Sequence, residues 1–419
     1  MSVQQAPRDR GAPCIAVVSD YTLATLGGAE NAFAEQVRAL AGVTRVLAVC
    51  PPSERLARLG THRGVETCAV PVSFVVPGLG FPVARNTPRL RRFLRKSFVA
   101  VGAEVVHVHS EFGIAAAAIA VARELRIPVV HTVHTFFWQS QASAQTLLSL
   151  LGPAFYKAMT GFEYSGSDLA ARPGDSALRN MTLSTARTVD AVVSPSAHQA
   201  ARLREAGLSR VHVLPNTVQW NHSARPIRDV DGPLRVTWVG RFAPEKRVLP
   251  FLRASFDALG RVGPGALQID LIGTGPELRT AQRLVGGRAG IRLHGRVPSE
   301  EIPSRLAQAH VTALTSIGWD NQPMTVAESI MALRGVIWCD PKLTEGLSEA
   351  GIAAFGADTA VLTDRLTALA ADPSPVLAAS ASALSARVTF GTERFVNDIL
   401  GIYRSAMHPS TTTLLRRPR

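Results

Sequence analysis

Short apolar runs alternate with amphipathic stretches along the first half of the chain. The apolar run at 14–20 is followed by a glycine turn and then by a helical pattern over 29–40. The alternation recurs with VVHVH before a helical stretch at 112–125 and continues as far as VHVLPN. Short apolar runs predict strands, and stretches with a helical period predict helices. Strands that alternate with helices predict a parallel sheet covered on both faces.

A second series of the same kind follows the polar stretch 219–233, with the strand-like runs LRVTWVG, LQIDLIG, IRLHG, VTALT and GVIWCD. We therefore expect an α/β protein of two doubly wound domains, 1–218 and 219–391, that face each other across a deep cleft. A last helical pattern, 392–407, is expected to cross back onto the first domain. The basic tail 408–419 is expected to be disordered.

The chain is strongly basic, with a formal net charge of +13. Such a charge favours anionic partners: a phosphorylated substrate, an anionic membrane surface or nucleic acid. Dispersed basic residues and an aromatic content of 6% count against nucleic acid. No apolar run is long enough to span a bilayer, and the N-terminus lacks the apolar stretch of a signal peptide. We expect a cytoplasmic protein, attached at most peripherally to a membrane, whose four scattered cysteines are buried free thiols.

Residues that directly follow the predicted strands are the first candidates for binding, because ligands of open parallel sheets lie beyond the carboxyl ends of the strands. Arg241 and Lys246 follow VTWVG and either bind phosphate oxygens or are solvated surface cations. Two glycine turns into helices either let a phosphate approach a helix N-terminus or are ordinary tight turns. These turns contain Gly27, Gly28, Gly273 and Gly275.

Two carboxylates surround the start of the helix predicted over 324–333. Asp320 precedes this helix together with the amides of Asn321 and Gln322, and Glu328 lies one turn inside it. The carboxylates either accept hydrogen bonds from sugar and ribose hydroxyls, or Asp320 caps the helix and Glu328 is solvated. Taken singly, each residue fits the second alternative better.

Histidines gather after two strands of the first half, at His107, His109, His131 and His134. Imidazole is a common metal ligand, but no cysteine or carboxylate accompanies these residues with the spacing of a metal site. The acidic pair Asp229 and Asp231 lies in the predicted linker before a strand. We therefore predict no metal site and regard His134, at a strand end, as the histidine best placed for a cleft.

Taken in order, these motifs resemble glycosyltransferase family 4, whose members are retaining enzymes of the GT-B architecture with two Rossmann-like domains. The resemblance extends over nearly the whole chain and rests on LGGAENAF, VVHVHSEFG, IPVVHTVHTFFW, VVSPSAHQAARLREAG, VHVLPNTV, VGRFAPEKR, LIGTGPE, IRLHGRV and DNQPMTVAES.

The resemblance implies a nucleotide-sugar site that needs no metal and no cofactor. Arg241 and Lys246 would hold the donor diphosphate and stabilise the leaving nucleotide, while Gly28 would let its loop approach that diphosphate. Glu328 would bind the ribose, and Arg296 with Val297 would border the base.

The resemblance also assigns residues near the transferred sugar. Asp320 takes the position of a glutamate that touches the hexose, and His134 matches the histidine near the sugar. The sequence departs from the family pattern at this Asp, at Arg247, where glycine is common, and in GVIWCD, which lacks a proline after its glycine. The shorter Asp leaves the choice of donor open.

We therefore expect a retaining hexosyltransferase that moves mannose or glucose from GDP-mannose or UDP-glucose to a membrane lipid or glycolipid. The HTVHTFFW segment is similar to that of members that glycosylate membrane lipids. The alternatives are transfer to a soluble or polysaccharide-precursor sugar and, more remotely, an inactive basic binding protein on this fold. A dinucleotide-dependent dehydrogenase is set aside because LGGAEN is no G-x-G-x-x-G motif.

The basic segment 85–98 has two interpretations. After Pro88, a helix would place Leu90, Phe93, Leu94 and Phe98 on one side, with Arg and Lys residues around the others. Such a helix either lies on anionic headgroups or is an ordinary domain helix whose apolar side faces its own sheet.

Overall fold

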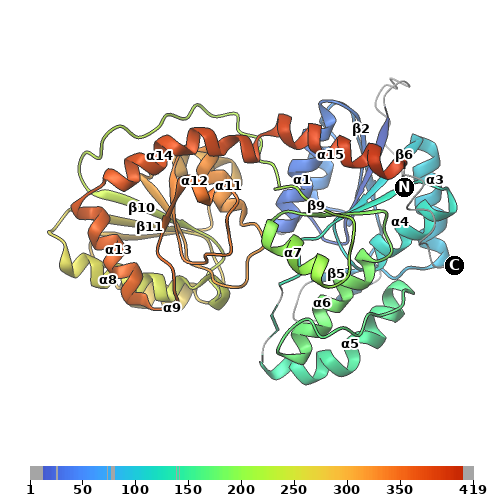
Figure 1. The fold of residues 1–419 in the computed structure, drawn as a ribbon, viewed down its shortest axis with the longest axis horizontal. Coiled ribbons are helices and arrows are strands. Elements are labelled where there is room, and N and C mark those ends of the chain that lie inside the picture. Colours follow the sequence, from blue (N-terminus) through green and yellow to red (C-terminus); the bar gives the residue numbers. More distant parts are fainter. Residues whose placement is uncertain are drawn as a thin grey trace. The chain divides into compact units, whose positions relative to one another are not determined.

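A computed structural model of the protein describes residues 13–24, 27–72, 74–76, 81–137, 139–140 and 142–408. These residues divide into two compact units (Figure 1). Unit 1 comprises the chain up to Thr217 together with the segment from Thr392 onward, and unit 2 is Val218–Gly391. All but the first residue of the basic tail 408–419 lies outside the described residues.

Unit 1 is built on a parallel sheet of seven strands in the order β3-β2-β1-β6-β7-β8-β9. Val18, the last residue of β1, pairs with Val49 and with Val108, so the carboxyl ends of β1, β2 and β6 are level at one edge. The short strands β4 and β5 pair antiparallel in a separate two-stranded sheet. The strands are β1 (Cys14–Val18), β2 (Arg45–Cys50), β3 (Val65–Ala69), β4 (Phe74–Val76), β5 (Phe81–Val83), β6 (Ala103–Val108), β7 (Val129–Thr132), β8 (Ala191–Ser194) and β9 (Val211–Val213).

Helices cover both faces of this sheet. Because side chains alternate along a strand, β1 sends Ile15 and Val17 into one core and Ala16 and Val18 into another. The first core is closed by α1, α2 and α15, and the second by α3 and α4 (Figure 1). The helices of unit 1 are α1 (Gly28–Ala41), α2 (Glu54–Leu59), α3 (Pro88–Val101), α4 (Gly113–Glu124), η1 (Ala142–Ala144), α5 (Gln145–Thr160), α6 (Pro173–Ala186), α7 (Ala197–Glu205) and α15 (Thr392–Met407).

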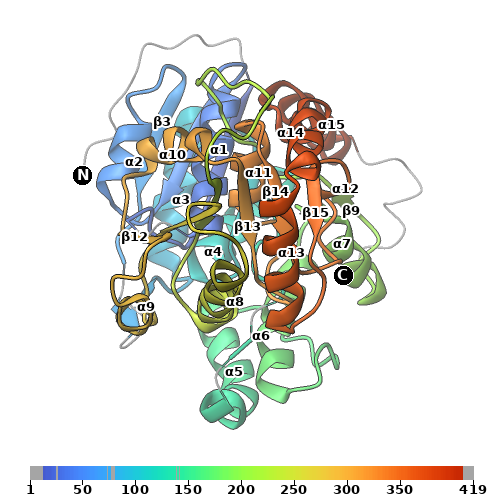
Figure 2. The ribbon, with the colours of Figure 1, turned by 90° about the vertical axis from the view of Figure 1, so that its left-hand side faces the viewer.

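Unit 2 repeats this architecture with six parallel strands in the order β12-β11-β10-β13-β14-β15. Figure 2 shows β13, β14 and β15 side by side. The two parallel sheets confirm the predicted α/β fold class. The strands are β10 (Leu234–Val239), β11 (Leu267–Ile272), β12 (Ile291–Gly295), β13 (Val311–Leu314), β14 (Gly335–Trp338) and β15 (Gly351–Ala353).

Figure 1 draws α8, α9 and α13 on one side of β10 and β11, and α11, α12 and α14 on the other. Phe251 and Leu252 of α8 join the apolar side chains of β10 and β11 in the main core of the unit. The helices of unit 2 are η2 (Pro244–Lys246), α8 (Val248–Arg261), α9 (Leu278–Val285), η3 (Ser299–Glu301), α10 (Ile302–Gln308), α11 (Met324–Met331), α12 (Leu347–Ala350), α13 (Thr359–Ala371), α14 (Ser374–Ala386) and η4 (Arg387–Phe390).

Helix α3 packs as an ordinary domain helix. Thr87 caps its first turn by accepting a hydrogen bond from the Leu90 amide, and Gly102 ends it in the left-handed conformation. Leu94 and Phe98 are fully buried in the core beneath the helix. The side of α3 that carries Leu94 and Phe98 is therefore not available to insert among lipid headgroups, and the exposed residues of the helix are mainly cations, with Val99.

All four cysteines are buried and unpaired, as expected. Burial raises the pKa of the Cys14 thiol to about 12 and that of Cys339 to about 11. These thiols remain protonated at neutral pH and serve as small apolar side chains.

Candidate functional site

Lys246 and Asp320 form an ion pair at the carboxyl edge of the unit 2 sheet. The Lys246 ammonium donates a hydrogen bond to the Asp320 carboxylate, and the Ser316 hydroxyl donates to the other carboxylate oxygen. The Lys246 side chain is 25% exposed and that of Asp320 10% exposed. Thr315 adds a hydrogen bond of 2.6 Å from its hydroxyl to the Lys246 carbonyl. A cation and a carboxylate from two distant loops are thus held together, partly shielded from water.

Arg241 follows β10 directly, and its side chain is exposed. Among the described residues, its guanidinium finds neither a hydrogen-bond nor an ion-pair partner. An unpaired guanidinium at a strand end is free to form a forked contact with phosphate oxygens.

Two glycines bring the loop of Arg241 against the next loop. A Cβ added at Gly273, whose φ is +139°, would lie 1.8 Å from the Gly240 carbonyl oxygen, and one at Gly275 would lie 2.4 Å from the Phe242 carbonyl oxygen. The Phe242 amide donates to the Thr274 carbonyl at 3.0 Å. These glycines are therefore required for packing between the loops that follow β10 and β11, irrespective of any ligand.

The loop between β13 and α11 is held by a carboxylate that the sequence analysis missed. Asp340, just after β14, is 4% exposed and accepts hydrogen bonds from the amides of Gly318, at 2.6 Å, and Lys342, at 3.0 Å. It thereby orders the loop that contains Asp320. Its place directly after a strand is the signal by which sequence analysis could have found it.

The other donor-side candidates lie at the same edge of unit 2. Arg296 and Val297 follow β12, and Arg296 is exposed. Asn321 and Gln322 lie in the loop before α11, and Glu328 is half-buried on that helix. The structure therefore places every donor-side candidate of the second half on loops or first turns beyond β10, β11, β12 and β13.

Gly27 and Gly28 begin α1 in unit 1. Gly27 is the N-cap residue in an extended conformation, and its carbonyl accepts from the Asn31 amide at 3.0 Å. A Cβ added at Gly28 would meet no atom of the described residues within 4 Å. The described residues leave room for a larger side chain at position 28.

Three of the four histidines make polar contacts inside unit 1, in two separate groups. His109 Nδ1 lies 2.9 Å from His134 Nε2, and the two rings are stacked at a centroid distance of 5.1 Å. His107 contacts the Thr132 hydroxyl at 2.7 Å and the Tyr403 hydroxyl of α15 at 2.6 Å. The position of His134 is therefore fixed by His109, a residue that the sequence analysis did not assign to catalysis.

Burial keeps these imidazoles uncharged. It lowers the pKa of His134 to about 4 and that of His131 to about 3, and it lowers the pKa values of His107 and His109 well below the ordinary range. Near neutral pH these four histidines are therefore uncharged, and their rings can both donate and accept hydrogen bonds.

Two buried acids complete the carboxyl edge of unit 1, and neither was among the predicted residues. Asp20 follows β1 and accepts from the Ile114 amide at 2.6 Å and the Ser110 hydroxyl at 2.7 Å, so it caps α4. Glu111 is 2% exposed and accepts from the hydroxyls of Tyr21, at 3.0 Å, and Thr182, at 3.2 Å. Burial raises the pKa of Glu111 above its ordinary value. Both acids follow strands, where the same rule could have found them.

Neither a metal cluster nor a membrane span is found in the described part of the chain. No three His, Cys, Asp or Glu side chains among these residues are grouped so that they could hold a metal ion. None of the described helices combines the length and the apolar character needed to cross a bilayer.

Comparison with models of known protein families finds a match in the first half of the chain. Residues 26–219 match the family Glycosyltransferase Family 4. A comparison with curated protein sequences finds no match.

Several solved structures share the fold over most of the chain. HepE from Anabaena in complex with UDP has a TM-score of 0.67 at 15% identity, over 94% of this chain and 100% of that one. The pneumococcal O-GlcNAc transferase GtfA in complex with UDP and GlcNAc has a TM-score of 0.65 at 12% identity, over 95% and 100%. The apo lipopolysaccharide outer core galactosyltransferase WaaB has a TM-score of 0.59 at 13% identity, over 94% and 99%.

Two parallel α/β sheets with this topology, together with these structural relatives, define the GT-B fold. The first half of the chain is thus similar to glycosyltransferase family 4, and most of the chain shares the fold of these solved structures.

Proposed function

We propose that the protein is a hexosyltransferase that uses a nucleotide-diphosphate sugar and transfers the sugar to a membrane lipid or glycolipid with retention of configuration. The observation that carries the proposal is the arrangement of Arg241, Lys246 and Asp320 at the carboxyl edge of the unit 2 sheet. An unpaired guanidinium and an ammonium on the loop after β10, the ammonium paired with a carboxylate on the loop after β13, suit a diphosphate attached to a hydroxyl-rich sugar.

In the proposed reaction, Arg241 and Lys246 bind the diphosphate oxygens and offset the charge that develops as the bond between the anomeric carbon and the phosphate oxygen breaks. The acceptor hydroxyl forms its bond to the anomeric carbon on the face that the nucleotide leaves, and its proton passes to a phosphate oxygen. Asp320 accepts hydrogen bonds from hexose hydroxyls. His134, neutral because of its burial, hydrogen-bonds to the sugar without adding charge.

The donor is assigned to a mannose or glucose nucleotide, and the relatives favour testing uridine first. HepE was solved in complex with UDP-glucose, and GtfA was solved in complex with UDP and GlcNAc. On this proposal Glu328 binds the ribose and Arg296 with Val297 borders the base. Gly27 and Gly28 border the diphosphate, and Asn321 and Gln322 support the sugar.

The acceptor is proposed to be a membrane lipid, which the enzyme would reach from the cytoplasmic face. The HTVHTFFW segment, which ends β7 and leads toward α5, supports this choice. A soluble or polysaccharide-precursor sugar is the alternative acceptor.

The test is to incubate the protein with radiolabelled UDP-glucose or GDP-mannose and a lipid extract, and to measure label that partitions into organic solvent. Thermal stabilisation by UDP and by GDP, measured in parallel, identifies the base. Label in a lipid product that depends on Arg241 supports the proposal. Transfer only to added soluble sugars would reject the lipid acceptor, and the absence of any transfer or nucleotide stabilisation would reject the activity.

A further inference from the structure

Helix α5 has apolar side chains on two sides, and only one side is covered. Gly152, Tyr156 and Met159 are buried and face α6: a Cβ at Gly152 would lie 3.1 Å from the Met181 methyl group, and the Tyr156 hydroxyl lies 2.7 Å from that of Thr185. These contacts account for the inward side of the helix.

The outward side is apolar as well. The exposed fractions are 60% for Leu147, 71% for Leu150, 57% for Leu151 and 39% for Phe155. With the exposed Ala154 and Ala158, these residues follow the i, i+3, i+4, i+7, i+8, i+11 spacing of one continuous helical face. A surface helix ordinarily presents polar residues on this side, so a stripe of this kind marks an interaction surface. We call these six residues the α5 stripe.

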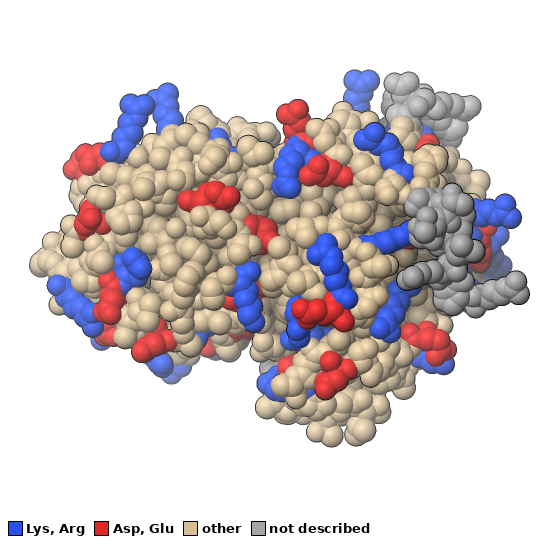
Figure 3. Space-filling model, viewed as in Figure 1, with Lys and Arg blue, Asp and Glu red and all other residues tan. Residues whose placement is uncertain are grey.

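The tip drawn at the lower edge of Figure 3, where Figure 1 places α5, shows few charged side chains. Elsewhere in the described chain, the strongly exposed large apolar residues occur singly, except for Leu384 and Val388, which are four positions apart. Leu384 is the one exposed leucine among them outside α5.

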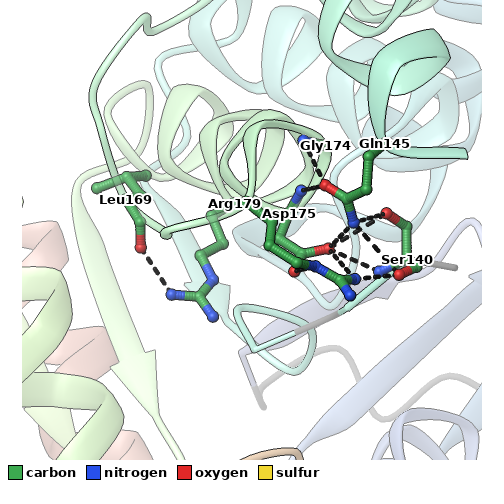
Figure 4. Close-up of polar contacts among 7 residues, drawn as sticks. Ser140, Gln145, Leu169, Gly174, Asp175 and Arg179 are labelled. Carbon is green, nitrogen blue, oxygen red and sulfur yellow. Dashed lines mark hydrogen bonds and ion pairs between the residues drawn. The ribbon is translucent and has the colours of Figure 1, made fainter. Parts of the chain in front are cut away.

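The start of α5 is held by a polar cluster on α6 (Figure 4). The Gln145 amide donates to Asp175 at 2.8 Å and accepts from the Gly174 amide at 2.7 Å. Asp175 also accepts from the Ser140 amide, at 2.7 Å, and from Arg172, at 2.9 Å. The α5 stripe is therefore a surface on a fixed helix pair rather than the side of a loose segment.

The far end of α5 is joined to the basic helix α3. The Asn86 amide donates to the Met159 carbonyl at 2.9 Å, the Asn86 side chain donates to the Thr160 carbonyl at 2.6 Å, and Arg85 donates to the Ala158 carbonyl at 3.3 Å. The α5 stripe is thus continuous with the beginning of α3.

Positive charge predominates where the end of α5 meets the start of α3. No Asp or Glu occurs in the sequence 67–103 or in 125–162, the two segments that contain α3 and α5. The exposed cations Arg89, Arg92 and Lys96 lie on α3, and Lys157 on α5 pairs with Glu163 at 2.9 Å. An apolar stripe beside unopposed cations complements a surface that offers hydrocarbon and negative charge together, which is an anionic lipid leaflet.

We propose that the α5 stripe is the membrane-docking surface of the enzyme, with its leucines and phenylalanine in the interfacial region of an anionic leaflet and the cations of α3 on the headgroups. The inference deepens the proposed function, on which it rests, because it gives the route by which a lipid acceptor reaches unit 1. The segment 135–144 joins His134 at the end of β7 to the start of α5, and Thr135 and Thr182 of α6 both donate to Glu111. His134 and helix α5 thus belong to one connected part of unit 1.

The experiment is sedimentation of the purified full-length protein with vesicles of phosphatidylcholine, with and without phosphatidylglycerol. Leu147, Leu150 and Leu151 are changed together to Ser, and Leu384→Ser is the matched control on an exposed leucine of unit 2. The triple variant should lose about tenfold or more of its vesicle partitioning, whereas the control should bind as the parent does. Arg89→Ser with Arg92→Ser should remove the preference for phosphatidylglycerol and the sensitivity to salt.

Thermal stabilisation by UDP is measured on every variant, which separates this inference from the proposed function. Unchanged nucleotide stabilisation with lost vesicle binding supports the docking surface. Vesicle binding by the triple variant equal to that of the parent would overturn it, as would a parent that does not bind anionic vesicles. A parent dimer in solution that the triple variant dissociates, without vesicle binding by the parent, would assign the stripe to a second copy of the chain.

Discussion

The Lys246 ammonium pairs with the Asp320 carboxylate, although 74 positions separate the two residues in sequence. The pair joins the loop after β10 to the loop after β13, which are neighbouring strands. Lys246 is therefore held in place by the fold itself, so on the proposed function a diphosphate would meet a cation whose position is already fixed. Preorganisation of this kind lowers the cost of reorganisation during the reaction.

The first prediction concerns the two cations of unit 2. Arg241→Ala or Lys246→Ala should leave the fold intact and lower kcat by about 10²-fold to 10³-fold, because each removes a fixed charge from the leaving group. Arg241→Lys should restore only part of the activity, since a single ammonium cannot form the forked contact. Steady-state transfer rates check this, with Arg253→Ala on the exposed side of α8 as the control. Near-normal turnover of both alanine variants would contradict the diphosphate assignment.

The second prediction concerns metal. Transfer should continue at an unchanged rate in excess EDTA, because cations of the chain perform the charge neutralisation. The measurement is the initial rate before and after chelation, followed by addition of Mg²⁺ or Mn²⁺. Activity that disappears in chelator and returns with metal would show that this prediction is wrong.

The third prediction compares Gly273, where a side chain would clash with the next loop, with Gly263, where a side chain would have room. Gly273→Ala should destabilise unit 2 by about 3 kcal/mol or more, because its Cβ would overlap the Gly240 carbonyl and its φ is positive. Gly263→Ala, where a Cβ meets no neighbour within 4 Å, is the matched control and should change stability little. Urea unfolding of both variants checks the difference; equal midpoints would refute the loop-packing argument.

The fourth prediction distinguishes a tight turn from an anion site at Gly28. Gly28→Ala should keep the parent melting temperature, since the added Cβ has open space around it and alanine suits a first helical turn. If the donor diphosphate approaches this backbone, the same variant should lower kcat/KM for the donor by about tenfold or more through steric exclusion. Unchanged kcat/KM would assign Gly28 to the turn alone.

The fifth prediction concerns the buried histidines. Their pKa values in the folded protein lie below the ordinary 6.5, at about 4 for His134 and about 3 for His131, so the unfolded chain binds more protons in acid. Their contribution to stability is therefore complete above pH 6.5 and is lost as the pH falls toward 4, with at most about 1.4 kcal/mol per pH unit for each histidine. Urea unfolding at pH 7.5, 6 and 5 measures the slope. His109→Gln should make it shallower, while the exposed His62→Gln should not; identical slopes for parent and His109→Gln would contradict the argument.

Hydrophobic periodicity alone was sufficient to predict the α/β class and the positions of helices such as α1 and α4. Both lie within a residue of the predicted ranges, because an amphipathic pattern over several turns has only one way to bury its apolar side. The rule that ligands lie beyond strand ends directed attention to Arg241 and Asp320. It applies equally to Asp20, Glu111 and Asp340, which the sequence analysis did not select, because nothing in a linear sequence shows which strand ends become neighbours.

Tertiary structure alone decided which apolar faces are covered. The sequence leaves α3 with two interpretations, a helix on anionic headgroups or an ordinary domain helix, and it offers a further apolar pattern in α5. In the folded chain Leu94 and Phe98 of α3 are buried against the sheet, while Leu150 of α5 is 71% exposed. Periodicity records that a side of a helix is apolar, but only the positions of the surrounding elements determine whether that side meets a core or water. The same reason applies to Lys246 and Asp320, which the sequence supplied separately and the order of β10 and β13 in the sheet brought together.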